Sequence, residues 1–73
     1  PPVFSEEVEI VSQRLVGEKH LALKLRHQGT PIDGIWFNHT DSLPARATIA
    51  FRLDADEWNG SRKVKFLIEG VQS

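Results

Sequence analysis

The chain has 73 residues, of which 40% are hydrophobic and 26% are charged, and its formal net charge at pH 7 is −1. This length allows one domain, and the composition is that of an ordinary globular protein rather than a disordered or membrane-spanning one. No apolar run approaches the ~20 residues of a membrane helix, and no signal-peptide pattern is present. The lack of cysteine excludes disulfides and cysteine zinc sites and suits a reducing cytosol.

The two ends of the sequence suggest a piece of a longer protein. The chain begins with two prolines instead of methionine, and it ends soon after its last apolar run. We interpret residues 1–73 as a single domain, a fragment of a longer chain.

Five segments alternate between apolar and polar residues with the two-residue period of β-strands. Within the first of them, the apolar face changes between Ile10 and Val11, which predicts a β-bulge or a sharp bend. No segment keeps a 3.6-residue period, so we expect no helix. The predicted strands are residues 7–15, 20–26, 32–38, 46–53 and 63–71.

Glycine and proline mark the connections between these segments. Residues 16–19 and 28–31 are typical of turns, and the polar segment 39–44 is too short for a helix. Residues 54–62 predict a nine-residue loop with Asn59-Gly60 as its turn.

The alternation also predicts which side chains face the core. If Ile35 and Phe37 point inward, Trp36 faces solvent and shares its face with Gly34 and Asn38. The predicted inward residues are Leu21, Leu23, Leu25, Ile35, Phe37, Ala47, Ile49, Phe51, Leu53, Val64, Phe66 and Ile68.

Five short strands without a helix predict an all-β fold closed into a small barrel, because closure removes the exposed sheet edges. The long first strand with a defect in its middle favours a five-stranded OB-fold Greek-key barrel, as does the long loop between strands four and five. An SH3-like barrel is the alternative.

The residue types do not assemble into a catalytic or metal-binding pattern. The three histidines lie on separate segments or opposite strand faces and lack ligand spacing. Asp54 and Asp56 begin a calcium-loop pattern, but Asn59 stands where that loop requires glycine. The pattern places no base to activate a serine or threonine. We therefore expect no catalytic residue, metal or cofactor in this chain.

Nucleic-acid binding is better supported by the pattern. OB-folds bind single strands on the outer face of strands two and three, where aromatic rings stack on bases and basic side chains neutralise phosphates. The candidate DNA-binding residues are Lys19, His20, Lys24, Arg26, Trp36, Asn38, Trp58, Asn59 and Arg62.

Each of the main candidates also has a purely structural interpretation. Trp36 could anchor this domain on another domain of the longer protein, and Trp58 could be a lid over one end of the barrel. Lys24 and Arg26 could form an ordinary solvated face. The sequence leaves these alternatives open.

Several stretches together resemble the C-terminal OB domain of the RecJ family, bacterial single-strand-specific 5′→3′ exonucleases of the DHH phosphoesterase type. The likeness covers nearly the whole chain, in order and at matching spacing. It is carried by residues 14–26, 33–38 and 50–60, with further agreement at 2–4 and 67–69.

The resemblance implies that the longer chain is a hydrolase in which two manganese or magnesium ions activate water, held by a catalytic domain that is absent here. It implies a bacterial, cytoplasmic protein of DNA recombination and repair, in which this domain helps hold single-stranded DNA at the catalytic core. The alternative is an interdomain clamp or protein-interaction module without direct DNA contact. The implied partners are single-stranded DNA, the catalytic domains of the same chain and, as a further candidate, single-strand-binding protein. We expect the fragment to be a monomer.

Overall fold

The computed structural model describes residues 2–72, which form strands and no helix, as the alternation predicted. Nothing in these residues could cross a membrane as a helix. The strands are β1 (Phe4–Val16), β2 (His20–His27), β3 (Thr30–Trp36), β4 (Arg46–Trp58) and β5 (Ser61–Gln72).

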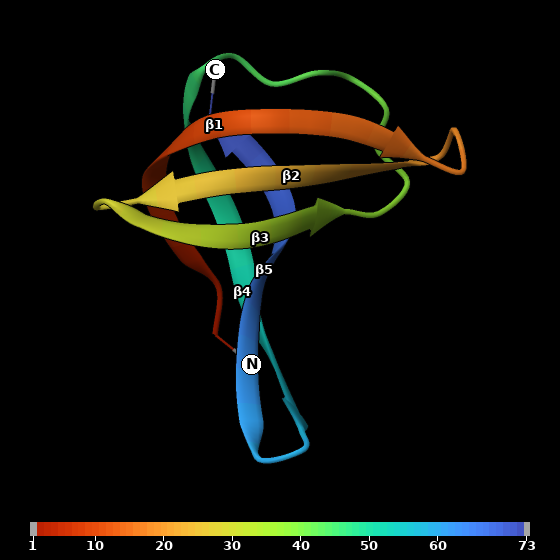
Figure 1. Ribbon diagram of the computed structural model, residues 1–73. Helices are drawn as coiled ribbons and strands as arrows, with labels where there is room; N and C mark the ends of the chain where they lie inside the picture. The colour runs from red at the N-terminus through yellow and green to blue at the C-terminus, as the bar shows by residue number, and fades with distance from the viewer. Residues whose placement is uncertain (1, 73) are drawn as a thin grey trace.

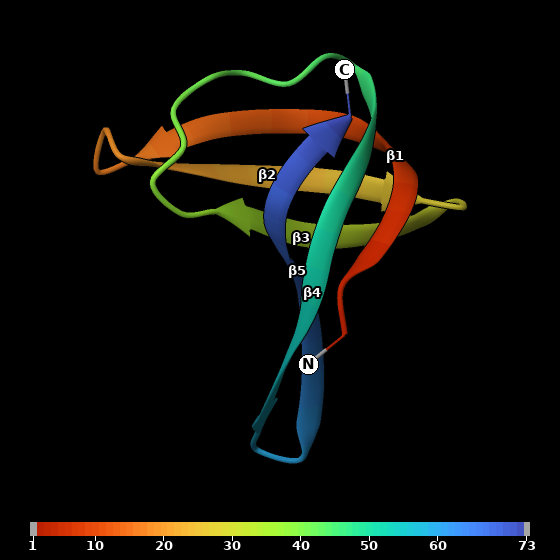
Figure 2. The same ribbon diagram turned by 180° about the vertical axis from the view of Figure 1, so that it is seen from behind.

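The strands close into a barrel in the order β1-β2-β3-β5-β4, with β4 paired back to β1. Every neighbouring pair is antiparallel except β3 and β5, which are parallel. The predicted defect in the first strand is confirmed, because the β1–β2 register shifts between Ile10 and Ser12. β1 can therefore bend from β2 to β4, and β4 and β5 cross the first three strands steeply (Figures 1 and 2). The predicted five-stranded Greek-key barrel is confirmed.

The core lies inside this barrel and is entirely apolar in the described residues. Three predicted inward residues are wrong: Phe37 and Leu53 are 53% and 51% exposed, and Ile35 lies opposite Ala22 on the outer side of β3. Val64 is half-buried on the same side of β5 as the buried Phe66. The buried residues are Val8, Ile10, Leu21, Leu23, Leu25, Leu43, Ala47, Ile49, Phe51, Phe66 and Ile68.

The predicted faces of β3 are reversed. Across the β2–β3 ladder, Leu21 lies opposite Trp36 and Leu23 lies opposite Gly34. Directly opposite residues in an antiparallel pair share one side of the sheet, so Trp36 and Gly34 face the core with the leucines. Trp36 is half-buried and packs against the core cluster. Ile35 consequently lies on the outer side.

Gly34 explains why this register is the stable one. A Cβ atom at Gly34 would lie 2.8 Å from Leu25 Cδ1 and 3.4 Å from Ile68 Cδ1. At Gly34, the inner side of β3 is therefore filled by side chains from β2 and β5. A residue without a side chain is needed at this point of the wall, and any larger residue would force its neighbours to move.

The predicted nine-residue loop between the last two strands is wrong, because β4 and β5 are joined by only two residues. Asn59 and Gly60 have φ angles of +50° and +77°, which fits the type I′ turn that joins twisted strands directly. Opposite charges face each other along the ladder at Asp54–Lys65 and Asp56–Lys63, which supports continued pairing. We call residues 54–65 the arm, and Figure 1 shows it projecting beyond the barrel.

The connection between β3 and β4 is held to the barrel by one side chain of β1. The Gln13 amide donates a hydrogen bond to the Leu43 carbonyl oxygen and accepts one from the Leu43 backbone N–H, both at 2.8 Å. Leu43 is thereby buried in the core cluster. The connection, drawn in green at the top of Figure 1, adds an apolar side chain to the core without forming a helix.

Candidate nucleic-acid interface

A groove of about 510 Å³ lies on the outer side of β2 and β3. Ala22 and Ile35, which are opposite each other in the ladder, contribute its apolar surface. Most of the other side chains around it are charged. We call this feature the outer groove; it is lined by Ser12, Gln13, Arg14, Ala22, Leu23, Lys24, Asp33, Gly34, Ile35, Asp56, Lys63 and Lys65.

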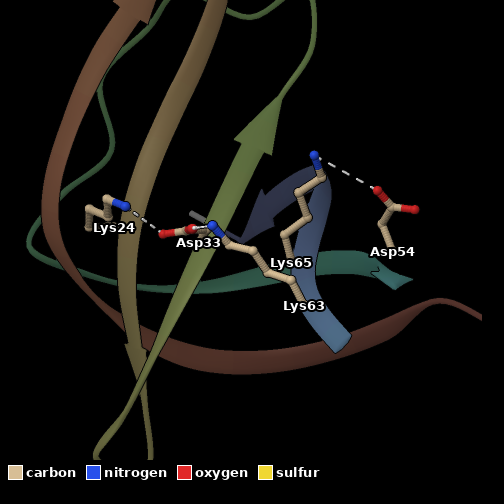
Figure 3. A network of polar contacts seen from close by, with 5 residues as sticks. All are labelled: Lys24, Asp33, Asp54, Lys63 and Lys65. Carbon is tan, nitrogen blue, oxygen red and sulfur yellow. Dashed lines mark hydrogen bonds and ion pairs between the residues drawn. The ribbon is translucent and has the colours of Figure 1, made fainter. Parts of the chain in front are cut away.

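A carboxylate lies among the lysines of this groove (Figure 3). Lys24 Nζ is 2.7 Å from Asp33 Oδ1, and Lys63 Nζ is 3.2 Å from Asp33 Oδ2. The hydrogen bond from Lys24 is the main reason why the pKa of Asp33 lies below its ordinary value of 3.8; partial burial opposes it, and Lys63 adds to it. A further pair, Lys65 with Asp54, lies at 3.9 Å on the arm.

Asp33 should make folding dependent on pH in the acid range. Folding lowers the pKa of Asp33, so its negative charge stabilises the domain fully at a pH above 3.8, the ordinary pKa that the group has in the unfolded chain. This stabilisation is lost as the pH falls through the lower pKa of the folded state. We therefore expect wild type to exceed Asp33→Asn in unfolding free energy by a constant amount from about pH 7 to about pH 5. The difference should shrink below that range in urea titrations. A difference that persists unchanged into strong acid would contradict this assignment.

Phe37 is the exposed aromatic side chain beside the outer face. It follows Trp36, so its side chain leaves β3 on the outer side, where it meets His20 of β2. The two ring centroids lie 5.1 Å apart at 78°, an edge-to-face contact. His20 Nδ1 also accepts a hydrogen bond of 3.0 Å from the Asn38 backbone N–H. His20 thus contacts the Phe37 ring and the backbone of the next residue, while Phe37 remains 53% exposed.

Trp36, by contrast, cannot offer a free ring to a base in this structure. Its ring stacks on His39 at a centroid separation of 3.5 Å and an interplanar angle of 1°. It also packs against the core. The prediction that Trp36 faces solvent on the DNA-binding face is wrong, because the β2–β3 register turns it inward.

Among the predicted basic residues, Lys24 lines the outer groove and Arg26 does not. Arg26 lies 3.4 Å from Glu9 and borders a smaller hollow of about 280 Å³ together with Glu7 and Arg46. Glutamates and arginines balance each other in the lining of that hollow, whereas basic side chains outnumber carboxylates in the outer groove, so the hollow is a less suitable path for a phosphate backbone.

The remaining predicted residues lie at the ends of two hairpins. Lys19 is exposed in the β1–β2 turn, and Asn59 and Arg62 are exposed at the tip of the arm. Figures 1 and 2 place these hairpin ends on different sides of the molecule. The side chain of Trp58 lies outside what the structure describes. The DNA-binding role of these residues stays a prediction.

Sequence reasoning missed several residues of this surface. Phe37 was missed because it was assigned to the core, although the spacing of β2 and β3 carried the information needed to turn it outward. Arg14 of β1 has an exposed side chain on the same groove. Lys63 and Lys65 carried no local signal, because they reach the outer face only through the parallel pairing of β3 with β5.

The described part of the chain lacks a cluster of side chains that could bind a metal ion. Residues 2–72 contain no group of three or more His, Cys, Asp or Glu side chains that could hold a metal ion. The carboxylates of the outer groove are instead interleaved with lysines. Basic side chains outnumber carboxylates in the lining of the outer groove.

The strand order, the closed barrel and the groove over β2 and β3 define an OB-fold domain. The model of the RecJ OB domain family matches residues 1–70, and the chain belongs to this family. This assignment confirms the OB-fold over the SH3-like alternative.

Two similar proteins are single-stranded-DNA-specific exonucleases named RecJ. The single-stranded-DNA-specific exonuclease RecJ of Dickeya dadantii is 37% identical over 75 residues, and that of Escherichia coli is 31% identical over 77 residues. These alignments cover 93% and 96% of this chain. They cover only 13% of each relative, so the chain spans a small part of the proteins it matches.

Proposed function

We propose that this domain binds single-stranded DNA along the outer groove, as part of a RecJ-type exonuclease. The observation that carries the proposal is an exposed aromatic ring, Phe37, on the same outer face as a groove rimmed by basic side chains. Single-strand binders combine these two elements, a stacking platform and a charged track for the backbone.

The contacts follow from the chemistry of the strand. Phosphates would meet Lys24, Lys65 and Arg14, whereas a base would stack on Phe37. The small side chain of Ala22 allows a flat base to lie close to the sheet between these points. None of these groups reads the edge of a base in a fixed geometry, so we expect binding with little sequence preference.

The longer protein would carry out the chemistry. We propose that it is a metal-dependent hydrolase of single-stranded DNA in the bacterial cytoplasm, with roles in recombination and repair. Its manganese or magnesium ions would be held by residues outside this chain. This domain would keep the strand at the catalytic domains and, as a further candidate contact, meet single-strand-binding protein. Alone, it would be monomeric.

Phe37→Ala should weaken binding of single-stranded DNA while leaving the barrel folded. Loss of one stacking platform lowers affinity by about 1–3 kcal/mol. The measurement is a fluorescence anisotropy titration of the 73-residue chain with a labelled oligothymidylate of about 12 nucleotides, within the range of OB-fold site sizes.

The matched control is Phe4→Ala, which removes an exposed phenylalanine that pairs with Phe51, away from the outer groove. We expect it to leave DNA affinity unchanged. If the two variants weaken binding equally, or if neither does, the outer face is not the DNA-binding surface.

An interdomain clamp is the second candidate function. It is favoured by exposed apolar side chains away from the outer groove, at Val3, Phe4 and Leu53. In that case Phe4→Ala and Leu53→Ala should increase proteolysis between this domain and the rest of the longer protein. Phe37→Ala should not.

A further inference from the structure

Asp33 occupies the place in the outer groove where a phosphate would be expected. It receives Lys24 from β2 and Lys63 from β5 on its two carboxylate oxygens, at 2.7 and 3.2 Å. The two lysine side chains are 68% and 76% exposed, whereas that of Asp33 is 32% exposed. Figure 3 shows the carboxylate between the two ammonium groups.

We propose that Asp33 is a built-in competitor for the DNA backbone, so that a phosphate must replace its carboxylate as the partner of Lys24 and Lys63. This inference rests on the proposed function and concerns the same groove. Carboxylate and phosphate oxygens both accept charge-assisted hydrogen bonds from ammonium groups, so the two acceptors compete for the same donors. The lowered pKa of Asp33 keeps the competing charge in place at neutral pH.

The Asp33 carboxylate is held close to the backbone by a short side chain, whereas its partners sit at the ends of long ones. Its position in β3 is paired with Lys24 on one side and with Lys65 on the other, and the next residue, Gly34, is packed into the core. The lysine side chains, in contrast, are long, flexible and largely solvated. On binding, the lysines can turn toward a phosphate, while the carboxylate stays and repels it.

Asp33 would therefore lower the affinity of the outer groove for single-stranded DNA in two ways. It engages two cations in the free domain, and it places a negative charge beside the bound backbone. Exposed ion pairs of this kind are weak and exchange readily, so DNA can still compete successfully. The result is a groove from which a bound strand is easily released.

The test compares Asp33→Asn with Asp56→Asn in the same oligothymidylate titration. Both changes remove one negative charge from the outer groove, but the described ion pairs of Lys24 and Lys63 involve Asp33 and not Asp56. Asp33→Asn should tighten binding by roughly three- to tenfold. The slope of log affinity against log salt should steepen by about 0.7 for each lysine released. Asp56→Asn should change affinity by less than about twofold, with an unchanged slope.

A double-mutant cycle separates release of the lysine from general electrostatics. Lys24→Gln should weaken binding more in the Asp33→Asn background than in wild type, because no carboxylate at position 33 competes with the phosphate for Lys24 in that background. Asp33→Ser, which also removes the charge, should reproduce the effect of Asp33→Asn, and circular dichroism checks the fold of each variant.

The outcomes separate this inference from the proposed function. If Asp33→Asn matches Asp56→Asn or weakens binding while wild type binds through Phe37, the competitor role is overturned and the proposed function stands. If wild type and both Asp33 variants fail to bind the oligonucleotide, both are overturned.

Discussion

Replacing Trp36 with alanine is expected to destabilise the barrel by about 3 kcal/mol, the lower end of the range for large aromatic residues in cores. Trp36 is half-buried, packs against the core opposite Leu21, and stacks on His39 at 3.5 Å. Its removal opens the end of the barrel and leaves His39 without its stacking partner. For a domain of this size, such a loss is a large part of the total stability.

The measurement is urea denaturation followed by circular dichroism, with Phe37→Ala as the matched control. Phe37 is the adjacent aromatic residue but is 53% exposed, so its removal should cost less than about 1 kcal/mol of stability. The pair therefore separates two roles: Trp36 supports the fold, whereas Phe37 contacts the DNA strand in the proposed function. Equal losses of stability, or a larger loss for Phe37→Ala, would contradict the observed faces of β3.

Leu25→Ala should also have a large effect on stability, about 2–5 kcal/mol. Leu25 is 1% exposed and lies against the space left by Gly34. Because β2 and β3 are joined by a tight turn and fixed in register, the wall cannot collapse into the cavity that the shorter side chain leaves. We expect the midpoint of urea denaturation to fall sharply, with part of the population unfolded in water.

Leu53→Ala is the control for this prediction. Leu53 continues the apolar alternation of β4 but is 51% exposed, since it lies at the base of the arm, where the barrel no longer encloses it. The same change of side chain should therefore alter stability by about 0.5 kcal/mol or less. Similar losses at the two positions would mean that the arm is packed in solution rather than extended.

The local pattern was sufficient for most of the fold. Leu21, Leu23 and Leu25 alternate with polar residues and are buried as predicted, because a strand with one buried side must repeat every two residues. The bulge after Ile10 was also visible, since an apolar pattern can change face only where the ladder slips. The closed barrel followed from the number and shortness of these strands.

The faces of β3 could also have been derived from the sequence. The turn at Gln28-Gly29 joins β2 to β3, and a connection of either two or four residues places Gly34 and Trp36 on the side of the leucines. A slip of two residues preserves the face, so only an odd slip would have put Trp36 outside. The error came from reading Ile35 and Phe37 as core residues by hydrophobicity alone, without the partner strand.

By itself, the sequence determined where the five strands lie, the buried sides of β2, β4 and β5, and the membership in a barrel family, because these depend on neighbours along the chain. Only the tertiary structure decided that Lys63 meets Asp33, that Gln13 binds the backbone of Leu43, and that residues 54–65 extend as an arm. These features depend on contacts between segments brought together when the barrel closes. A local two-residue period does not tell which residue of a distant strand will lie opposite a given residue. This pairing of strands decides which charged side chains line the outer groove.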